Sequence, residues 1–229
     1  MRLSWDNQGE RFYELGVKNC VLYVINEEAT ANSTSQYKKG VAWNGVTEIS
    51  ENREGGDANK HYADNLVYCI TRGAEEYGLT INAFQSPVEF DECDGEAFIG
   101  NNQYARIGQQ KRKMFGLAYR TEIGNDILGE DYGYKIHVVW GCTAAPTERT
   151  YSTINDSPDP QELSWEVDCL PVTLDVAGQN IRPFSTMVFE SRNLSAEQMT
   201  QLENKLFGSD NTEPYLPKPE ELYTLFSGN

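Results

Sequence analysis

The residues that could do acid–base or nucleophilic chemistry are few in this chain. It has only two histidines, His61 and His137, and one of them would have to serve any Ser–His–Asp or Cys–His site. His61 stands in a polar stretch, whereas His137 stands between Ile136 and Val138 in a strand-like run. Neither has a second His, a Cys or a carboxylate at metal-ligand spacing. We therefore expect His61 to be solvated and His137 to be a sheet residue with a hydrogen-bond partner.

Other signatures of catalysis or ligand binding are missing from the sequence. It contains no GxSxG elbow, no Walker loop and no GxGxxG, so the common hydrolase and nucleotide-binding motifs are excluded. Residues 126–131 (DILGED) lack the alternating ligands and terminal Glu of a calcium loop. The acidic cluster within residues 89–94 is typical of a solvated face, because the two acids of a glycosidase come from separate strands. The sequence thus predicts no enzyme, no cofactor and no metal site.

The five cysteines are also interpreted as structural. Their odd number and wide spacing exclude a CxxC motif and argue against a disulfide scaffold. Four of them stand in apolar, strand-like segments, where a reduced cysteine behaves as a small buried hydrophobe. The five are Cys20, Cys69, Cys93, Cys142 and Cys169.

The charge balance disfavours nucleic-acid binding. The formal net charge is −16, from 35 acidic and 19 basic residues, whereas a phosphate-binding surface needs clustered Lys and Arg. An acidic surface keeps a protein soluble and repels DNA. The basic run Lys111-Arg112-Lys113 stands near Arg106. It is interpreted as a solvated face or as a set of intersubunit ion-pair partners for the acidic loops.

Length and composition indicate a globular protein. The 229 residues fit one ordinary domain, or one domain with arms, and 39% are hydrophobic and 11% aromatic. The longest apolar run, Cys20 to Ile25, is far shorter than the roughly 20 residues of a membrane-spanning helix. No apolar segment follows Arg2, so no secretory signal is expected and the protein should be made in a cytoplasm.

Short strand-like runs separated by turn signals dominate the chain and predict a mainly β fold. Residues 134–140 (YKIHVVW) form the clearest strand pattern. Trp43, Trp140 and Trp165 fall within strand patterns and are expected in the core. The other expected strands are 16–25, 40–50 in two pieces around Asn44-Gly45, 65–71, 77–85, 113–122, 133–144, 151–154, 163–174 and 183–191.

Two helices and two other segments complete this organisation. A capping box at Ser86 predicts a short helix, and Ser195 with Gln198 predicts a longer one over 195–207 that Gly208 ends. Residues 51–64 (ENREGGDANKHYAD) are long, polar and glycine-bearing, and are expected to form a mobile loop. Residues 209–229 form a Pro- and Glu-bearing extension with a short helix after Pro219.

An ordered set of segments resembles the phage major tail protein family, the tail tube subunits of long-tailed phages and prophages. No single segment is specific, but together they run in order through most of residues 15–208. The segments are GVKNCVLY (16–23), GVAWNGVTEISENREGGDAN (40–59), YADNLVY (62–68), EEYGLTINAFQSPVEFDECDG (75–95), IGQQKRKMFGLAYRTEIGNDILGEDYGYKIHVVWG (107–141) and YSTINDSPDPQELSWEV (151–167).

This resemblance implies two packed β-sheets, in a β-sandwich or barrel-like tail tube fold, flanked by a short helix and a C-terminal-region helix. The tail tube domain would span 1–208 and the extension 209–229. The resemblance further implies hexameric rings that stack into a tube, of the non-contractile type, through which DNA passes without specific binding. Other partners would be the tape measure, initiator or baseplate, and terminator proteins of a virion tail assembled in the host bacterial cytoplasm.

The family has no active site, and its subunits reach the next ring through a long hairpin loop that corresponds to 51–64. The implied inter-ring contact residues are Arg53, Gly55, Gly56, Asp57, Asn59, Lys60 and His61. Two departures from the family are the longer loop at 26–39 and the extension after Gly208. Two other interpretations stay open: a β-sandwich binding module for carbohydrate or host surfaces, as in a baseplate, and an acid-based hydrolase.

Overall fold

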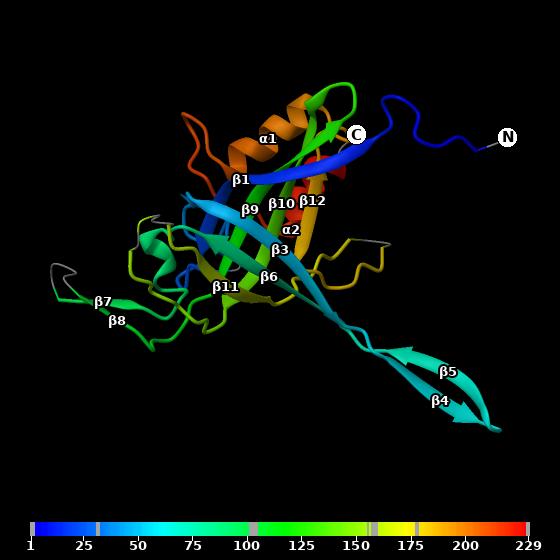
Figure 1. Ribbon diagram of the computed structural model, residues 1–229, viewed down its shortest axis with the longest axis horizontal. Helices are drawn as coiled ribbons and strands as arrows, with labels where there is room; N and C mark the ends of the chain where they lie inside the picture. Colours follow the sequence, from blue (N-terminus) through cyan, green and yellow to red (C-terminus); the bar gives the residue numbers. More distant parts are fainter. Residues whose placement is uncertain are drawn as a thin grey trace.

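The computed structural model describes residues 3–30, 33–100, 105–154, 156, 160–176 and 179–227. Strands account for 46% and helices for 11% of the structure, and the sheets are antiparallel (Figure 1). The expected mainly β fold with minor α and packed sheets is confirmed. Among the helices in the described part of the chain, none is long and apolar enough to span a membrane.

The elements follow one another from a long first strand to two helices near the C-terminus. The strands are β1 (Phe12–Val24), β2 (Val41–Ala42), β3 (Val46–Gly55), β4 (Ala58–Ala63), β5 (Leu66–Arg72), β6 (Glu75–Ala83), β7 (Ala97–Ile99), β8 (Ala105–Ile107), β9 (Phe115–Asn125), β10 (Gly129–Ala144), β11 (Leu163–Cys169) and β12 (Thr186–Glu190). The helices are η1 (Val88–Phe90), α1 (Ala196–Leu206) and α2 (Pro219–Ser227).

The main sheet has eight strands and folds over on itself. Its order is β2-β1-β9-β10-β11-β6-β3, and β12 also pairs with β10. The long strand β10 is shared, because its first part pairs with β9 and β12 and its last residues pair with β11. The half β11-β6-β3 thereby faces the half that contains β1, β9 and β10, and β1 also contacts β3. The two packed layers are therefore two halves of one continuous sheet.

Gly141 marks the place where β10 changes partners. The register of β10 against β9 shifts between Val139 and Cys142, and Gly141 between them has φ +69°. A Cβ atom at Gly141 would lie 2.3 Å from the carbonyl oxygen of Leu170. The position thus requires glycine, both for its left-handed backbone and for the close approach of a neighbouring strand.

Two hydrophobic cores lie on opposite faces of β1, β9 and β10. The first fills the space between the two sheet halves, and the second lies between the outer face and the helices α1 and α2. The first core includes Cys20, Leu22, Trp43, Leu79, Ile81, Phe90, Cys93, Phe115, Leu117, Val139, Cys142, Trp165 and Cys169. The second includes Val21, Tyr23, Ala118, Ile136, Val138, Trp140, Met199, Leu202, Leu206, Leu216 and Leu222.

Several sequence expectations for the core are confirmed. Trp43, Trp140 and Trp165 are buried, and so are Cys20, Cys142 and Cys169 of the four cysteines in strand-like segments. The expectation is wrong for the fourth, Cys69, which is exposed on β5 because no second layer covers that strand, whereas Cys93, outside the expected strands, is buried in the first core. The helix expected over 195–207 forms with both hydrogen bonds of its capping box.

The segment after Gly208 packs against the second core. Leu216 and Leu222 are buried there, and the indole Nε1 of Trp140 donates a hydrogen bond to the carbonyl oxygen of Pro217 at 3.0 Å. The expected short helix near Pro219 is α2. Residues 209–227 therefore contribute to the packing of the sheet.

Some local expectations are wrong. Residues 51–64, expected to be a mobile loop, lie mostly in β3 and β4. These strands pair with β6 and β5, so hydrogen bonds across the hairpin satisfy the backbone although no core covers the polar side chains. Ser86 does not cap a helix: Pro87 precedes a single 3₁₀ turn that has no side-chain cap. Residues 151–154 form no strand, and Tyr151 and Ile154 are exposed. The two pieces around Asn44-Gly45 form as β2 and β3 but pair with β1 and β6.

Candidate functional site

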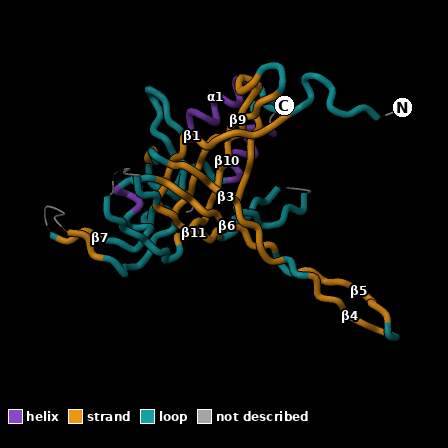
Figure 2. Tube along the Cα trace, viewed as in Figure 1, coloured by secondary structure: helices purple, strands orange, loops and turns teal. Residues whose placement is uncertain are grey.

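A two-stranded arm is the most prominent feature of the molecule outside the cores. Strands β3 and β6 extend past the main sheet and continue as the hairpin β4–β5, which projects into solvent (Figures 1 and 2). Every residue of β4 and β5 is exposed. We call residues 58–72 the arm and the rest of the described chain the body.

The joint between arm and body is built from glycines. The pairing of β3 with β6 ends at Gly55 opposite Glu75, and the pairing of β4 with β5 begins beyond it. Gly55 has φ +79° and Gly56 has φ +68°, so consecutive residues adopt the left-handed conformation that favours glycine. The amide of Gly56 donates a hydrogen bond to the carbonyl oxygen of Ala74 at 3.1 Å. The two strands of the hairpin are thus bent at the same level.

The arm carries apolar side chains that nothing in the subunit covers. Leu66 is 72% exposed and Tyr68 is 79% exposed. Scattered exposed hydrophobics are normal, but a group on one small element marks an interaction site. The group, which we call the arm patch, consists of Tyr62, Leu66, Val67, Tyr68 and Ile70.

The residues expected to make inter-ring contacts lie on the first strand of the hairpin and at its joint. Arg53 and Gly55 belong to β3, Gly56 and Asp57 lie at the joint, and Asn59, Lys60 and His61 belong to β4. The Nε2 atom of His61 lies 2.9 Å from the hydroxyl of Thr71 on β5. Sequence reasoning missed the arm patch, because the run 66–70 (LVYCI) reads like an ordinary buried strand. The sequence feature that could have indicated the arm patch is the polar segment 51–64, which comes shortly before this apolar run.

A polar cluster joins the base of β3 to the opposite half of the sheet. Glu51 accepts a hydrogen bond from the hydroxyl of Tyr119 at 3.0 Å, and its Oε1 lies 3.3 Å from Nδ1 of His137. The rings of Tyr119 and His137 stack with centroids 4.5 Å apart, and Nε2 of His137 lies 3.0 Å from the hydroxyl of Thr121. The interaction with His137 is the largest reason why the pKa of Glu51 is lowered to about 2.

This cluster confirms that His137 is a sheet residue with partners. Glu51 lies only a few residues before the glycine joint. The cluster therefore holds the base of the arm against β9 and β10. The arm therefore leaves the body from an anchored base.

The outward face of β3, β6 and β11 is polar and acidic. Side chains alternate along these strands, so Ile49, Ile81 and Trp165 point into the first core while their neighbours point to solvent. Part of this face forms a shallow depression lined by acidic side chains from all three strands. We call this surface the acidic face; it carries Glu48, Ser50, Asn52, Glu54, Glu76, Thr80, Asn82, Ser164, Glu166 and Asp168.

A second apolar surface lies around the start of β1 and the β9–β10 turn, at the upper edge of the body in Figure 1 and separate from the arm. The backbone amide of Gly9 donates to both carboxylate oxygens of Asp126 at 3.0 and 3.1 Å, which ties the N-terminal segment to this turn. The Phe12 and Tyr132 rings lie 5.0 Å apart. The exposed apolar side chains of this surface, the turn patch, are Phe12, Tyr13, Leu15, Ile127 and Leu128.

The basic run 111–113 is largely engaged within the subunit. Arg112 lies 3.0 Å from Asp94, and Lys113 lies 2.8 Å from Glu92. Lys111 is exposed and makes no ion pair with any residue that the structure describes. Of the three candidate intersubunit residues, Lys111 alone is left with its charge uncommitted in the described part of the chain.

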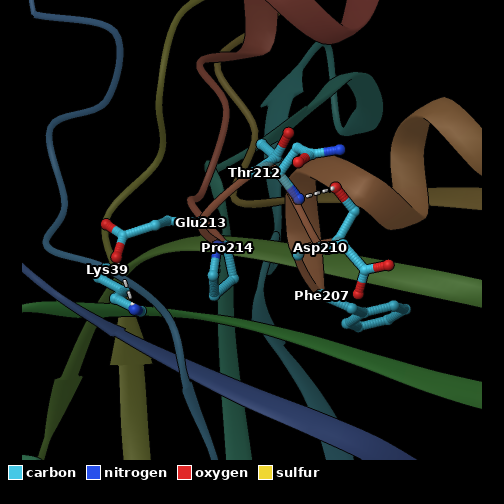
Figure 3. A pocket seen from close by; sticks show the side chains of 9 residues that line it. Lys39, Phe207, Asp210, Thr212, Glu213 and Pro214 are labelled. Carbon is cyan, nitrogen blue, oxygen red and sulfur yellow. Dashed lines mark hydrogen bonds and ion pairs between the residues drawn. The ribbon is translucent and has the colours of Figure 1, made fainter.

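An open depression near the end of α1 shows no catalytic arrangement. It is lined by Lys39 and by residues 207–214, and Lys39 and Glu213 form an ion pair of 2.7 Å across it (Figure 3). No cysteine or histidine lines it. Within the described ranges, no group of three or more His, Cys, Asp or Glu side chains is placed to hold a metal ion.

Comparison with models of known protein families gives no match to this chain, and comparison with curated protein sequences gives none either. The arm, the acidic face and the turn patch are therefore interpreted from their own geometry.

Proposed function

We propose that the chain is a structural virion protein, a major tail protein whose copies form hexameric rings that stack into the tube of a phage tail. It would assemble in the bacterial cytoplasm and leave with the virion. The observation that carries this proposal is the arm, a hairpin with an apolar surface and no core of its own. The order of sequence segments, which resembles the tail tube family, supports the same function.

The arm makes physical sense as a contact between copies. An isolated two-stranded hairpin is marginally stable in water, and its outer edges leave backbone donors and acceptors unpaired. A second copy of the chain supplies a suitable partner, because the turn patch is an exposed apolar surface on a different part of the body from the arm. A contact between two different surfaces of identical subunits propagates from one subunit to the next, as a stacked tube requires.

The acidic face suits the wall of a DNA conduit. It presents Glu and Asp side chains over three adjacent strands, and no Lys or Arg shares that face of the described sheet. A wall of this charge repels the phosphate backbone, so DNA would slide along it instead of binding. In this arrangement the acidic face lines the lumen.

The decisive experiment removes the arm and leaves the body intact. Deleting residues 57–72 joins Gly56 to Gly73, which already lie close together at the joint, because a Cβ atom at Gly73 would lie 4.0 Å from the backbone nitrogen of Gly56. We expect a folded subunit with a nearly unchanged melting temperature that forms no stacked tubes in negative-stain electron microscopy at rising concentration. Normal tubes from the deleted protein would contradict the proposal.

A matched pair of point variants separates the arm patch from the arm as a whole. Val67→Ser with Tyr68→Ser removes apolar contact surface, whereas Ala63→Ser with Thr71→Ser changes exposed residues of the same hairpin that belong neither to the arm patch nor to the expected inter-ring contact residues. We expect the first pair of changes to abolish assembly and the second to preserve it. Equal assembly by both proteins would show that the patch is not the contact.

A module that binds carbohydrate or a host surface is the second candidate. The exposed rings of Tyr62 and Tyr68 on one hairpin favour it, because sugars stack on exposed aromatic side chains. Binding of the monomeric protein to a glycan array, lost with Tyr68→Ser, would favour this function over tube formation.

A further inference from the structure

Two buried cysteines face one another across β10 and β11. Cys142 pairs directly with Cys169 in the antiparallel register, and their sulfur atoms lie 3.5 Å apart. Both are free thiols. The neighbouring amide of Leu170 donates to the carbonyl oxygen of Gly141 at 2.9 Å, which makes Cys142 and Cys169 a pair without hydrogen bonds between their own backbones.

That type of pair brings side chains closest together. In a non-hydrogen-bonded antiparallel pair the two Cα atoms typically lie about 4.5 Å apart, which is within the range of roughly 4.4–6.8 Å that a disulfide spans. The bulge at Gly141 creates the juxtaposition, because it shifts the alternation of β10 by one residue. Trp140 points into the second core and Cys142 into the first, beside Cys169.

We propose that Cys142 and Cys169 form an oxidative modification site, at which a hydroperoxide converts the two thiols into a cross-strand disulfide. The inference rests on this geometry and is independent of the proposed tube function.

The two sulfurs have different parts in the reaction. Cys169 is 8% exposed and Cys142 is fully buried, so we expect hydrogen peroxide to reach the Cys169 sulfur first. The Cys169 thiolate attacks one peroxide oxygen, forms a sulfenic acid and releases hydroxide, which takes up the thiol proton to give water. The sulfur of Cys142 then attacks the sulfenic sulfur, and its proton leaves with the departing hydroxyl as a second water.

Burial explains why Cys142 acts second. It raises the pKa of the Cys142 thiol well above its usual range, so this group stays protonated and is a poor nucleophile toward peroxide in solution. Overall, two thiols are oxidised to one disulfide and one peroxide is reduced to two water molecules. The bond would connect β10 to β11 at the place where β10 leaves β12, and would close the loop from residue 142 to 169.

The test uses the full-length protein with Cys69→Ser, because Cys69 is exposed and would react first. After treatment with hydrogen peroxide in native buffer, the protein is denatured, alkylated and mapped by mass spectrometry without reductant. We expect peptides containing residues 142 and 169 to be joined, while Cys20 and Cys93 remain alkylated as internal controls. The melting temperature should rise by about 5–10 °C and fall again with dithiothreitol.

Cys142→Ala in the same background provides the matched control. It should yield no linked peptide, and the sulfenic acid on Cys169 should become trappable by dimedone. Three results would overturn the proposal: sulfinic acid at Cys169 without a link, a link involving Cys20 or Cys93 instead, or unreacted thiols at both positions under peroxide that fully oxidises Cys69 of the unchanged protein.

Discussion

The body and the arm are both built from antiparallel strands, but they are stabilised in different ways. In β11 the residues alternate between buried and exposed, and Trp165, Val167 and Cys169 enter the first core. In β5, which is equally rich in apolar residues, every residue is exposed. A strand is therefore buried only where a second layer covers it, whatever its composition.

This difference separates stability of the subunit from the assembly that we propose. Side chains of the body stabilise the subunit, so changes there should alter the free energy of unfolding. The side chains of the arm are exposed and enter neither core, so under the proposed function changes there should alter assembly more than the free energy of unfolding. Three pairs of substitutions test this division, from the largest expected effect to the smallest.

Gly141→Ala should be the most damaging change to the body. The new Cβ would lie 2.3 Å from the Leu170 carbonyl oxygen on a backbone with φ +69°, and we expect a loss of about 4 kcal/mol or more. Unfolding in urea measures this loss in the free energy of unfolding. Gly129→Ala is the control, because Gly129 has φ +59° but no atom within 4 Å of the added Cβ, so about 1–2 kcal/mol is expected. Equal losses would show that crowding at Leu170 is unimportant.

The same substitution in the two regions sharpens the comparison. Leu22→Ala removes a fully buried side chain of the first core, and should lower the free energy of unfolding by about 2–5 kcal/mol. Leu66→Ala removes a side chain that is 72% exposed, and should change the free energy of unfolding by about 0.5 kcal/mol or less. A destabilisation by Leu66→Ala comparable with that of Leu22→Ala would mean that the arm is not independent of the body.

Glu51→Gln tests the connection between the two regions. The pKa of Glu51 is lowered in the folded protein, so its carboxylate stabilises the fold above the unfolded pKa of about 4.5, and this stabilisation is lost as the pH falls toward about 2. The variant should be less stable by roughly 1–3 kcal/mol at pH 7, and the two unfolding curves should converge near pH 2. Glu54→Gln, on the exposed part of β3, should change stability little at any pH. A pH-independent effect of Glu51→Gln would exclude this role of its charge.

The elements of the body were predictable because their patterns have a direct physical cause. The alternation around Trp165 follows from a strand with one buried face, and the capping box at Ser195 follows from the free amides at the start of a helix. Both elements are confirmed. The pairing of β10 with three partners was not predictable, because it depends on one bulge at Gly141 whose backbone angle no periodicity reveals.

The candidate surfaces were predictable only in part. The polar residues 51–64 indicate an exposed segment, and the hairpin is exposed. Their polarity also predicts a mobile loop, whereas the structure has strands there. Ladder hydrogen bonds between β4 and β5 satisfy the backbone whatever the side chains are. The apolar run after them was assigned to a strand, and nothing local distinguishes an apolar strand that lacks a covering layer from one that has it.

The glycine joint has a consequence for how fast copies of the chain would meet. Gly55 and Gly56 are both left-handed, and because glycine has the widest choice of backbone angles we expect the hairpin to pivot about its anchored base. Strands rise about 3.4 Å per residue, so the tip of the arm extends on the order of 20 Å beyond the joint. A pivoting arm of that reach sweeps a larger volume than a rigid one, which widens the capture radius of each collision and relaxes the orientation that a productive encounter demands.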